Sequence, residues 1–162
     1  MATPIHSIEG VALDSTGEMV AGSLGAGMEA VAAHFADPGS VWPTLANGVD
    51  VVSAGDDWTL GNFATIVAAE DIATGFHVDS VNVEAIDQDA VFEMVLYYGA
   101  GDTEMNRVRF AAEGGFFGNA RYPVNSLHIP GDSQVRAKLA SSNGAAFVAT
   151  IRISLGIRLH VA

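Results

Sequence analysis

Histidines and carboxylates are the side chains of this sequence that could hold a metal ion or transfer a proton. The five histidines show no H-x-H or H-E-x-x-H spacing, so a zinc site would need histidines far apart in the chain to converge. His77 and Asp79 could supply two ligands, but solvated side chains at a sheet edge are the simpler interpretation. The chain has no cysteine, which excludes disulfides and thiolate nucleophiles. We therefore expect no metal site.

The acidic residues include three close pairs, Asp56 with Asp57, Asp87 with Asp89, and Asp102 with Glu104. All three fall in expected turns, where aspartate commonly bonds to the backbone, and none has the spaced oxygen ligands of a calcium loop. No pair stands out as the two carboxylates of a glycoside hydrolase. The sequence motifs of serine hydrolases and of phosphate-binding loops are also missing. The expectation is a protein that is not an enzyme, with no catalytic residues and no cofactor.

Trp58 follows the first of these acidic pairs, and two interpretations of it remain open. It could be an aromatic platform that contacts a glycan. It could instead be an anchor at the start of a strand, where a buried tryptophan supplies a large apolar area. The anchor is the favoured interpretation.

The charges of the chain are unevenly distributed. The net charge is −12, and all seven Lys and Arg residues lie beyond residue 106, whereas residues 1–106 hold 17 of the 19 acids. Such an acidic chain repels phosphate, so we expect neither nucleic-acid binding nor binding to an anionic membrane. No apolar run is long enough to span a membrane, and the N-terminus lacks the cationic and apolar regions of a secretory signal.

Three of the cations are candidate subunit-interface residues. Arg136, Lys138 and Arg152 lie in alternating segments and are expected to project from one sheet face. Acids of residues 50–104 on a neighbouring subunit could meet them, which would close a ring of subunits. The alternative is that these cations pair with acids of their own subunit and contribute little to association.

The elements that must position these residues differ between two regions. Residues 1–48 are expected to form a Gly/Ala-rich N-terminal arm. One short helix is predicted there from a stripe of apolar residues at helical spacing, Met28, Val31, Ala32 and Phe35. Residues 25–30 read G-x-G-x-x-A and open this helix. They lack the flanking parallel strands of a dinucleotide loop, so a flexible linker is favoured.

Residues 49–162 read as one strand after another. The expected strands span residues 49–53, 63–67, 76–86, 90–98, 106–111, 124–129, 134–140, 146–155 and 157–161. A change of alternation near Ser80 predicts a bulge, and Ser142-Asn143-Gly144 predicts a hairpin turn. Strands at this spacing with no helices between them indicate an all-β protein, an antiparallel β-sandwich of the jelly-roll type.

The stretch from Asp57 to Leu155 resembles a family of structural proteins of tailed bacteriophages. The resemblance rests on Trp58-Thr-Leu-Gly61, the segment Phe76–Ile86, Leu96-Tyr-Tyr-Gly99 with Asp102-Thr-Glu104, and Ile129-Pro-Gly-Asp-Ser-Gln-Val-Arg-Ala-Lys-Leu-Ala-Ser-Ser142. The family motif reads Ile-Pro-Ala-Gly, a hydroxyl residue and Arg; here Gly131, Asp132 and Gln134 depart from it. The resemblance implies a virion component with a β-sandwich and brings no catalytic residues.

The expected function is therefore that of a capsid decoration (cement) protein. Such a protein would be made in the host cytoplasm, would bind the major capsid protein on the outer surface of the virion, and by analogy would form a homotrimer. The alternatives are a tail or baseplate component, and a carbohydrate-binding adhesin that contacts a host-surface glycan through Trp58.

Overall fold

The computed structural model describes residues 7–8, 11–12, 39–44, 47–113, 120–143 and 147–160. The short helix and the G-x-G-x-x-A motif expected between residues 25 and 35 lie outside the described residues. Near the N-terminus, β1 (Ser7–Ile8) and β2 (Val11–Ala12) pair in an antiparallel ladder. Residues 38–160 form a separate compact unit, and it contains all the other strands. No helix of the described residues is long and apolar enough to cross a membrane.

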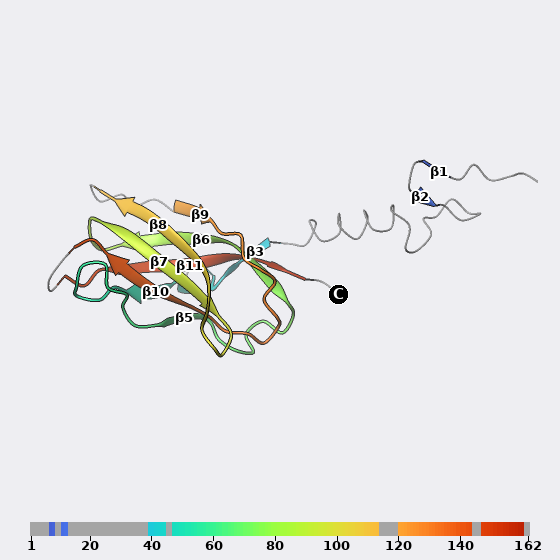
Figure 1. Cartoon of the computed structure of the whole chain (residues 1–162), viewed down its shortest axis with the longest axis horizontal. Coiled ribbons are helices and arrows are strands. Elements are labelled where there is room, and N and C mark those ends of the chain that lie inside the picture. Colours follow the sequence, from blue (N-terminus) through green and yellow to red (C-terminus); the bar gives the residue numbers. More distant parts are fainter. Residues whose placement is uncertain are drawn as a thin grey trace, which may run out of the picture. The chain divides into compact units, whose positions relative to one another are not determined.

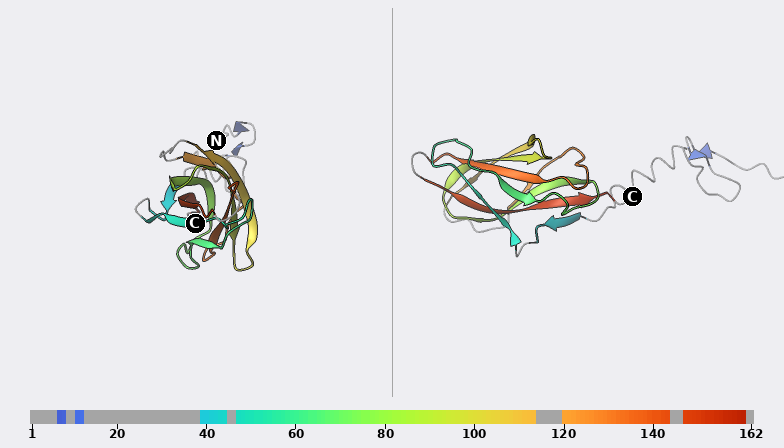
Figure 2. Two further views of the ribbon diagram at one scale, coloured as in Figure 1. Left: turned by 90° about the vertical axis from the view of Figure 1, so that its left-hand side faces the viewer. Right: turned by 90° about the horizontal axis from the view of Figure 1, so that it is seen from below.

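This unit consists of two antiparallel sheets, as predicted (Figure 1; Figure 2, right). The first, here called the β10 sheet, contains in spatial order β5 (Ala64–Val67), β10 (Val135–Ser141), β7 (Ala90–Tyr98) and β8 (Thr103–Ala112). The second, called the β11 sheet, contains β3 (Gly39–Trp42), β11 (Thr150–Leu159), β6 (Phe76–Ile86) and β9 (Ala120–Pro123), and β4 (Val49–Val52) also pairs with β11.

The order of the strands is that of a jelly roll. In the β11 sheet, β11 lies between β6 on one side and β3 with β4 on the other, so the last strand pairs with the first strands of the unit. In the β10 sheet, β10 lies between β5 and β7. Of the connections from β5 onward, only β7 to β8 joins neighbours in one sheet, and the others cross between sheets. A four-stranded and a five-stranded sheet joined by connections that cross between them confirm the predicted jelly-roll sandwich.

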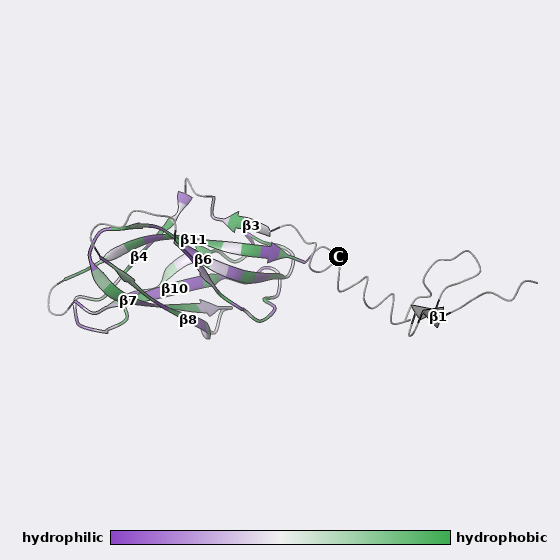
Figure 3. Ribbon diagram, turned by 90° about the horizontal axis from the view of Figure 1, so that it is seen from above, coloured by the Kyte–Doolittle hydropathy of each residue, from purple (hydrophilic) through white to green (hydrophobic). Residues whose placement is uncertain are grey.

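The core fills the space between the sheets with alternating residues. Phe92, Met94 and Leu96 of β7 are fully buried, and Ile151 and Leu155 of β11 are buried opposite them in the same cluster. Figure 3 shows this alternation of hydrophobic and hydrophilic residues along β11. Burying each such side chain contributes about 1.5–3 kcal/mol, so the alternating pattern fixes which face of each strand points inward.

The segment 124–129, expected to be a strand, runs alongside β6 in space but does not pair with it as a regular strand. The predicted bulge is present: the register of β6 against β11 shifts so that Asp79 has no partner on β11. The amide of Val78 therefore donates to the hydroxyl of Ser126, and the amide of Val124 donates to the carbonyl of Asp79. The strand prediction was wrong because the bulge interrupts regular pairing there. On the edge of β6 that faces away from β11, the strand that pairs is β9, just before this segment.

The expected hairpin at Ser142-Asn143-Gly144 is a second correction. β10 and β11 lie in different sheets, so the connection between them crosses the sandwich and joins no paired strands. β11 also runs without a break through Gly156, where the sequence suggested two strands. By contrast, β6 and β7 have the bounds that were predicted.

Candidate interaction surface

The outer face of the β10 sheet carries three rows of side chains that cross its strands. The first row places Arg109 of β8 beside Glu93 of β7 and Ala140 of β10. The second row contains Arg107, Val95 and Lys138, and the third contains Glu104, Tyr97, Arg136 and Thr65. These residues alternate with the core residues of the same strands, although Val95 and Ala140 of the rows are themselves buried. Four of the seven cations of the chain therefore share one face.

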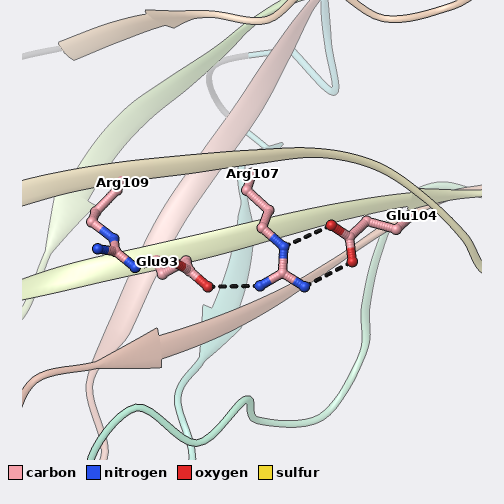
Figure 4. A network of polar contacts seen from close by, with 4 residues as sticks. All are labelled: Glu93, Glu104, Arg107 and Arg109. Atoms are coloured by element: carbon pink, nitrogen blue, oxygen red, sulfur yellow. Dashed lines mark hydrogen bonds and ion pairs between the residues drawn. The ribbon is translucent and has the colours of Figure 1, made fainter.

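Ion pairs between β7 and β8 organise one half of this face (Figure 4). Glu93 accepts hydrogen bonds from Arg109 at 2.5 Å and from Arg107 at 2.9 Å. Arg107 also donates through Nε and Nη2 to both carboxylate oxygens of Glu104, at 2.6 and 2.8 Å. The bond from Arg109, followed by that from Arg107, lowers the pKa of Glu93, and the bond from Arg107 lowers the pKa of Glu104.

The other half of the face combines aromatic rings with cations. The rings of Phe63 and Tyr97 meet edge to face, with centroids 5.1 Å apart. Arg136 and Lys138 both lie over the ring of Phe63, each 4.2 Å from its centroid, at the distance of a cation–π contact. Arg136 is also paired with Asp102. Burial, with a further effect of nearby Glu104, raises the pKa of the Tyr97 hydroxyl.

Trp58 belongs to the same face and is not the buried anchor that the sequence favoured. Its side chain is 44% exposed, and its backbone amide donates to the carbonyl of Ser141 at the end of β10. The guanidinium of Arg109 lies 5.2 Å from the centroid of its ring. The ring stays at the surface because residue 58 lies in the turn before β5 rather than at the start of a strand. Its φ of 51° is left-handed.

The three candidate interface cations do not share one face, which corrects the sequence-based expectation. Arg136 and Lys138 project from the β10 sheet, whereas Arg152 belongs to the β11 sheet. Arg152 donates to both carboxylate oxygens of Asp50, at 2.8 and 3.2 Å, and this contact lowers the pKa of Asp50. The sequence alternation places these side chains outward, but it cannot say which sheet a strand joins.

Three histidines that are distant in the sequence meet at one end of the β11 sheet. The ring centroids of His128 and His160 are 4.6 Å apart, and His77 lies 4.8 Å from His160 and 5.7 Å from His128. Nδ1 of His77 lies 3.2 Å from the carbonyl oxygen of Ser126. A side chain in place of Gly75 would collide with the ring of His128. Across the described part of the chain, no group of three or more His, Asp or Glu residues is arranged to hold a metal ion.

The close acidic pairs mostly serve the backbone and the arginines. Asp87 accepts a hydrogen bond from the amide of Thr150 at 2.8 Å, at the corner where β6 leads into β7. Asp102 lies in the turn before β8, with a left-handed φ of 50°. Glu104 lies within β8 rather than in a turn and is bound by Arg107.

The sequence analysis missed Phe63 and Tyr97 as parts of the face. Tyr97 follows Val91, Glu93 and Val95 on the side of β7 that alternates with the core, so its outward position was available from period-two alternation. Phe63 lies just before β5, and only the pairing of β5 with β10 brings it to Lys138. No local signal gives that contact.

No protein-family model matches this chain, and no curated protein matches it. Among solved structures, the chain is similar to a chain of the T13 particle of infectious bursal disease virus, at 19% identity and a TM-score of 0.35. It is also similar to the VP2 subviral particle of that virus, at 17% identity and a TM-score of 0.36. Each match covers 76% of this chain, which spans about a third of the viral chains (32% and 33%). Similarity at this level assigns no function.

Proposed function

We propose that this chain is a structural protein of a tailed-bacteriophage virion, without enzymatic activity. More specifically, it is a head decoration (cement) protein that binds the major capsid protein through the outer face of the β10 sheet. The observation that carries the proposal is the composition of that face. It holds three aromatic rings, Trp58, Phe63 and Tyr97, with three arginines and a lysine among them. Tyr, Trp and Arg are the residues enriched at protein interfaces and at their energetic centres.

The chemistry of the face supports binding rather than catalysis. A general base needs a pKa near the working pH, whereas the arginines beside Glu93 and Glu104 lower the pKa of both carboxyls. The long side chains are already held by one another across the strands, so less side-chain entropy is lost when a partner docks.

The resemblance of residues 57–155 to phage structural proteins supports the virion setting. A jelly roll that folds as one compact unit can be added to a finished shell as a separate protein. The acidic balance of the chain, −12 overall, opposes contact with packaged DNA and suits the outer surface of the capsid. The partners implied are the major capsid protein and copies of this chain.

Particle composition and capsid binding test the proposal. Quantitative mass spectrometry of purified particles should find hundreds of copies on the head. A count of a few dozen or fewer, on tails, would replace the decoration role with the tail or baseplate role. In a binding assay with undecorated heads, Phe63→Ala should weaken binding about tenfold or more, the loss expected at an interface centre. Val52→Ala is the matched control, because Val52 is 39% and Phe63 37% exposed, on opposite sheets. Equal binding by both variants would contradict docking through this face.

A carbohydrate-binding adhesin is the second candidate, favoured by the exposure of Trp58. Arg109 lies over the ring, so a sugar could stack on the indole only where the guanidinium leaves it open. A glycan array with wild-type protein and Trp58→Ala tests this candidate. Binding that disappears in the variant would support the adhesin, and an array without signal would remove it.

A further inference from the structure

The outer face of the β11 sheet contains a polar hollow of about 230 Å³ that the proposed function does not use. It lies over Gly156 of β11, between β3 on one side and β6 and β9 on the other. In register across the sheet, Val41 and Ser80 flank Gly156. The hollow exists because the middle residue of this row has no side chain.

The floor of the hollow is polar and largely buried. Ser80, which lines the hollow, and Ser154, which does not, are both fully buried, although their strands point these side chains away from the core. They are joined through Asn82: the Ser80 hydroxyl donates to the Asn82 carbonyl oxygen, and the Asn82 amide donates to the Ser154 hydroxyl, each at 3.3 Å. Asn82 is only partly buried and lines the hollow, so its side-chain amide is the member of this set that a ligand can reach. A Cβ at Gly156 would collide with the Ser80 hydroxyl, so the glycine is what allows Ser80 to lie over β11 at the base of the hollow.

The rim supplies one cation and one anion. Arg121 of β9 lines the hollow, and its guanidinium reaches to 3.7 Å from where a Cβ of residue 156 would lie. In the described part of the chain, no acid is paired with Arg121, although the arginines at 107, 109, 136, 152 and 158 all have such partners. Asp79 of the neighbouring strand β6 also lines the hollow, and Arg158 donates to both of its carboxylate oxygens, at 2.8–3.1 Å. Asp79 is thereby fixed as an acceptor.

We propose that this hollow binds an acidic saccharide, a single sugar ring that carries a carboxylate. Arg121 would bind the carboxylate through two parallel N–H···O bonds, the geometry that guanidinium and carboxylate favour. Asp79 and Asn82, which are only partly buried, would bind the ring hydroxyls, and the exposed side chain of Val41 would lie against the apolar side of the ring.

The size and openness of the hollow select this ligand class. Its volume is below the ~300 Å³ at which sites for drug-sized molecules begin, so it admits one ring with its substituents. Ser40, Val41 and Arg121 at the rim are exposed, so the ligand stays partly in water. That favours a single acidic residue of a surface glycan that is otherwise neutral, because a net charge of −12 repels a polyanion. Binding would be weak at each site and strengthened by many copies. Only this last step, the many copies, rests on the proposed virion function.

Nuclear magnetic resonance of the isolated full-length chain tests the site without any particle. Titration with glucuronate should shift the amide signals of Ser80, Asn82 and Gly156 and saturate at millimolar concentration. Glucose should bind at least tenfold more weakly, since it lacks the carboxylate. Acetate and inorganic phosphate are the two further probes. If either binds as well as glucuronate, the saccharide assignment is wrong.

Two variants and a control separate the site from the fold. Arg121→Gln should weaken glucuronate binding about tenfold or more and leave glucose binding unchanged. Val41→Trp, a change at an exposed position, should block the hollow and abolish binding of both sugars. Arg109→Gln removes the same charge from the other sheet and should change neither. If glucuronate causes no shift at the hollow, or if Arg109→Gln weakens binding as much as Arg121→Gln, the proposal is overturned. Neither result would bear on capsid binding through the β10 sheet.

Discussion

At the scale of single residues, the acidic and basic segments of the sequence form ion pairs between adjacent strands. Glu93 is one of the last acids of the acidic segment, and Arg107 and Arg109 are the first cations that follow it. The pairing of β7 with β8 places Glu93 opposite Arg109 and beside Arg107, so the boundary between the acidic and basic segments falls within one hairpin. The charges form a local network as a result.

This network predicts how stability depends on pH. Because the arginines lower the pKa of Glu93 and Glu104 in the folded protein, both carboxylates stabilise the fold above the unfolded pKa of about 4.3. That stabilisation is lost as the pH falls through the lowered values. In Glu93→Gln, the free energy of unfolding should therefore fall less steeply as the pH is lowered. At neutral pH the variant should be less stable than the wild type by no more than about 1 kcal/mol, since the arginines are largely exposed.

Urea denaturation at a series of pH values measures this effect. Glu113→Gln is the control, because Glu113 is exposed at the end of β8 and no ion pair of Glu113 is found within the described residues. If the free energy of unfolding of Glu93→Gln falls with decreasing pH as steeply as that of the wild type, protonation of this network is not coupled to folding.

At the scale of elements, the turn before β10 shows how this chain departs from the phage motif. Where the motif reads Ala-Gly, the chain has Gly131 and Asp132. A Cβ at Gly131 would collide with the backbone carbonyl of Ala73. Asp132 has a left-handed φ of 57°, the conformation in which glycine is favoured and aspartate is tolerated. The amide of Asp132 donates to the carbonyl of Ile72 at 2.8 Å, which ties the turn to the β5–β6 connection.

Substitution at Gly131 should cost much more stability than substitution at Asp132. Gly131→Ala, which restores the first motif residue, should destabilise the fold by about 2 kcal/mol or more, because the backbone of Ala73 must move. Asp132→Gly, which restores the second, should stay within about 1 kcal/mol of the wild type, because relief of the left-handed strain offsets the added freedom of the unfolded chain. Denaturation midpoints compare the two. A neutral Gly131→Ala would mean that the turn can shift away from Ala73.

The elements also show what could be predicted from sequence and what could not. Alternation of apolar and polar residues predicted β6 and β7 with their observed bounds, because it reports which face of a strand is buried. It could not place β10 and β11 in different sheets, since burial on one face says nothing about the partner strand. Strands β3 (Gly-Ser-Val-Trp) and β9 (Ala-Arg-Tyr-Pro) were missed because they contain glycine or proline, which are depleted in strands, whereas the equally short β4 and β5 are rich in β-branched residues and were predicted. The contacts of Phe63 and the hollow over Gly156 depend on those pairings and were missed with them.

At the scale of the whole sandwich, the two outer faces offer different chemistry. The face of the β10 sheet presents aromatic rings and cations in ordered rows, as a surface for a protein partner. The face of the β11 sheet presents small polar residues and a hollow, as a site for a small ligand. On the two proposals made above, the β10 sheet would contact the capsid and the β11 sheet would stay open to solvent and its ligand.

The predicted homotrimer is constrained by these two faces. The sequence suggested a ring in which Arg136, Lys138 and Arg152 of one subunit meet acids of the next. In the folded chain Arg136 is paired with Asp102 and Arg152 with Asp50, on opposite sheets. Cations already paired within their own subunit gain little from a second acid. A trimer would therefore rely on apolar and backbone contacts, and its stability should not depend on screening of charge.

Light scattering across a salt series tests this prediction in full. Raising the salt from 0.1 M to 1 M shortens the screening length from about 10 Å to about 3 Å, which would loosen an ionic ring and leave an apolar trimer unchanged. We expect the trimer mass to persist across the series. Arg152→Glu should also leave the mass unchanged, although it places a third acid beside Asp50 and Glu84 and so lowers the stability of each subunit slightly. Dissociation of the trimer in high salt, or in Arg152→Glu, would support the ionic ring after all. A chain that is monomeric both in solution and on particles would refute the trimer itself.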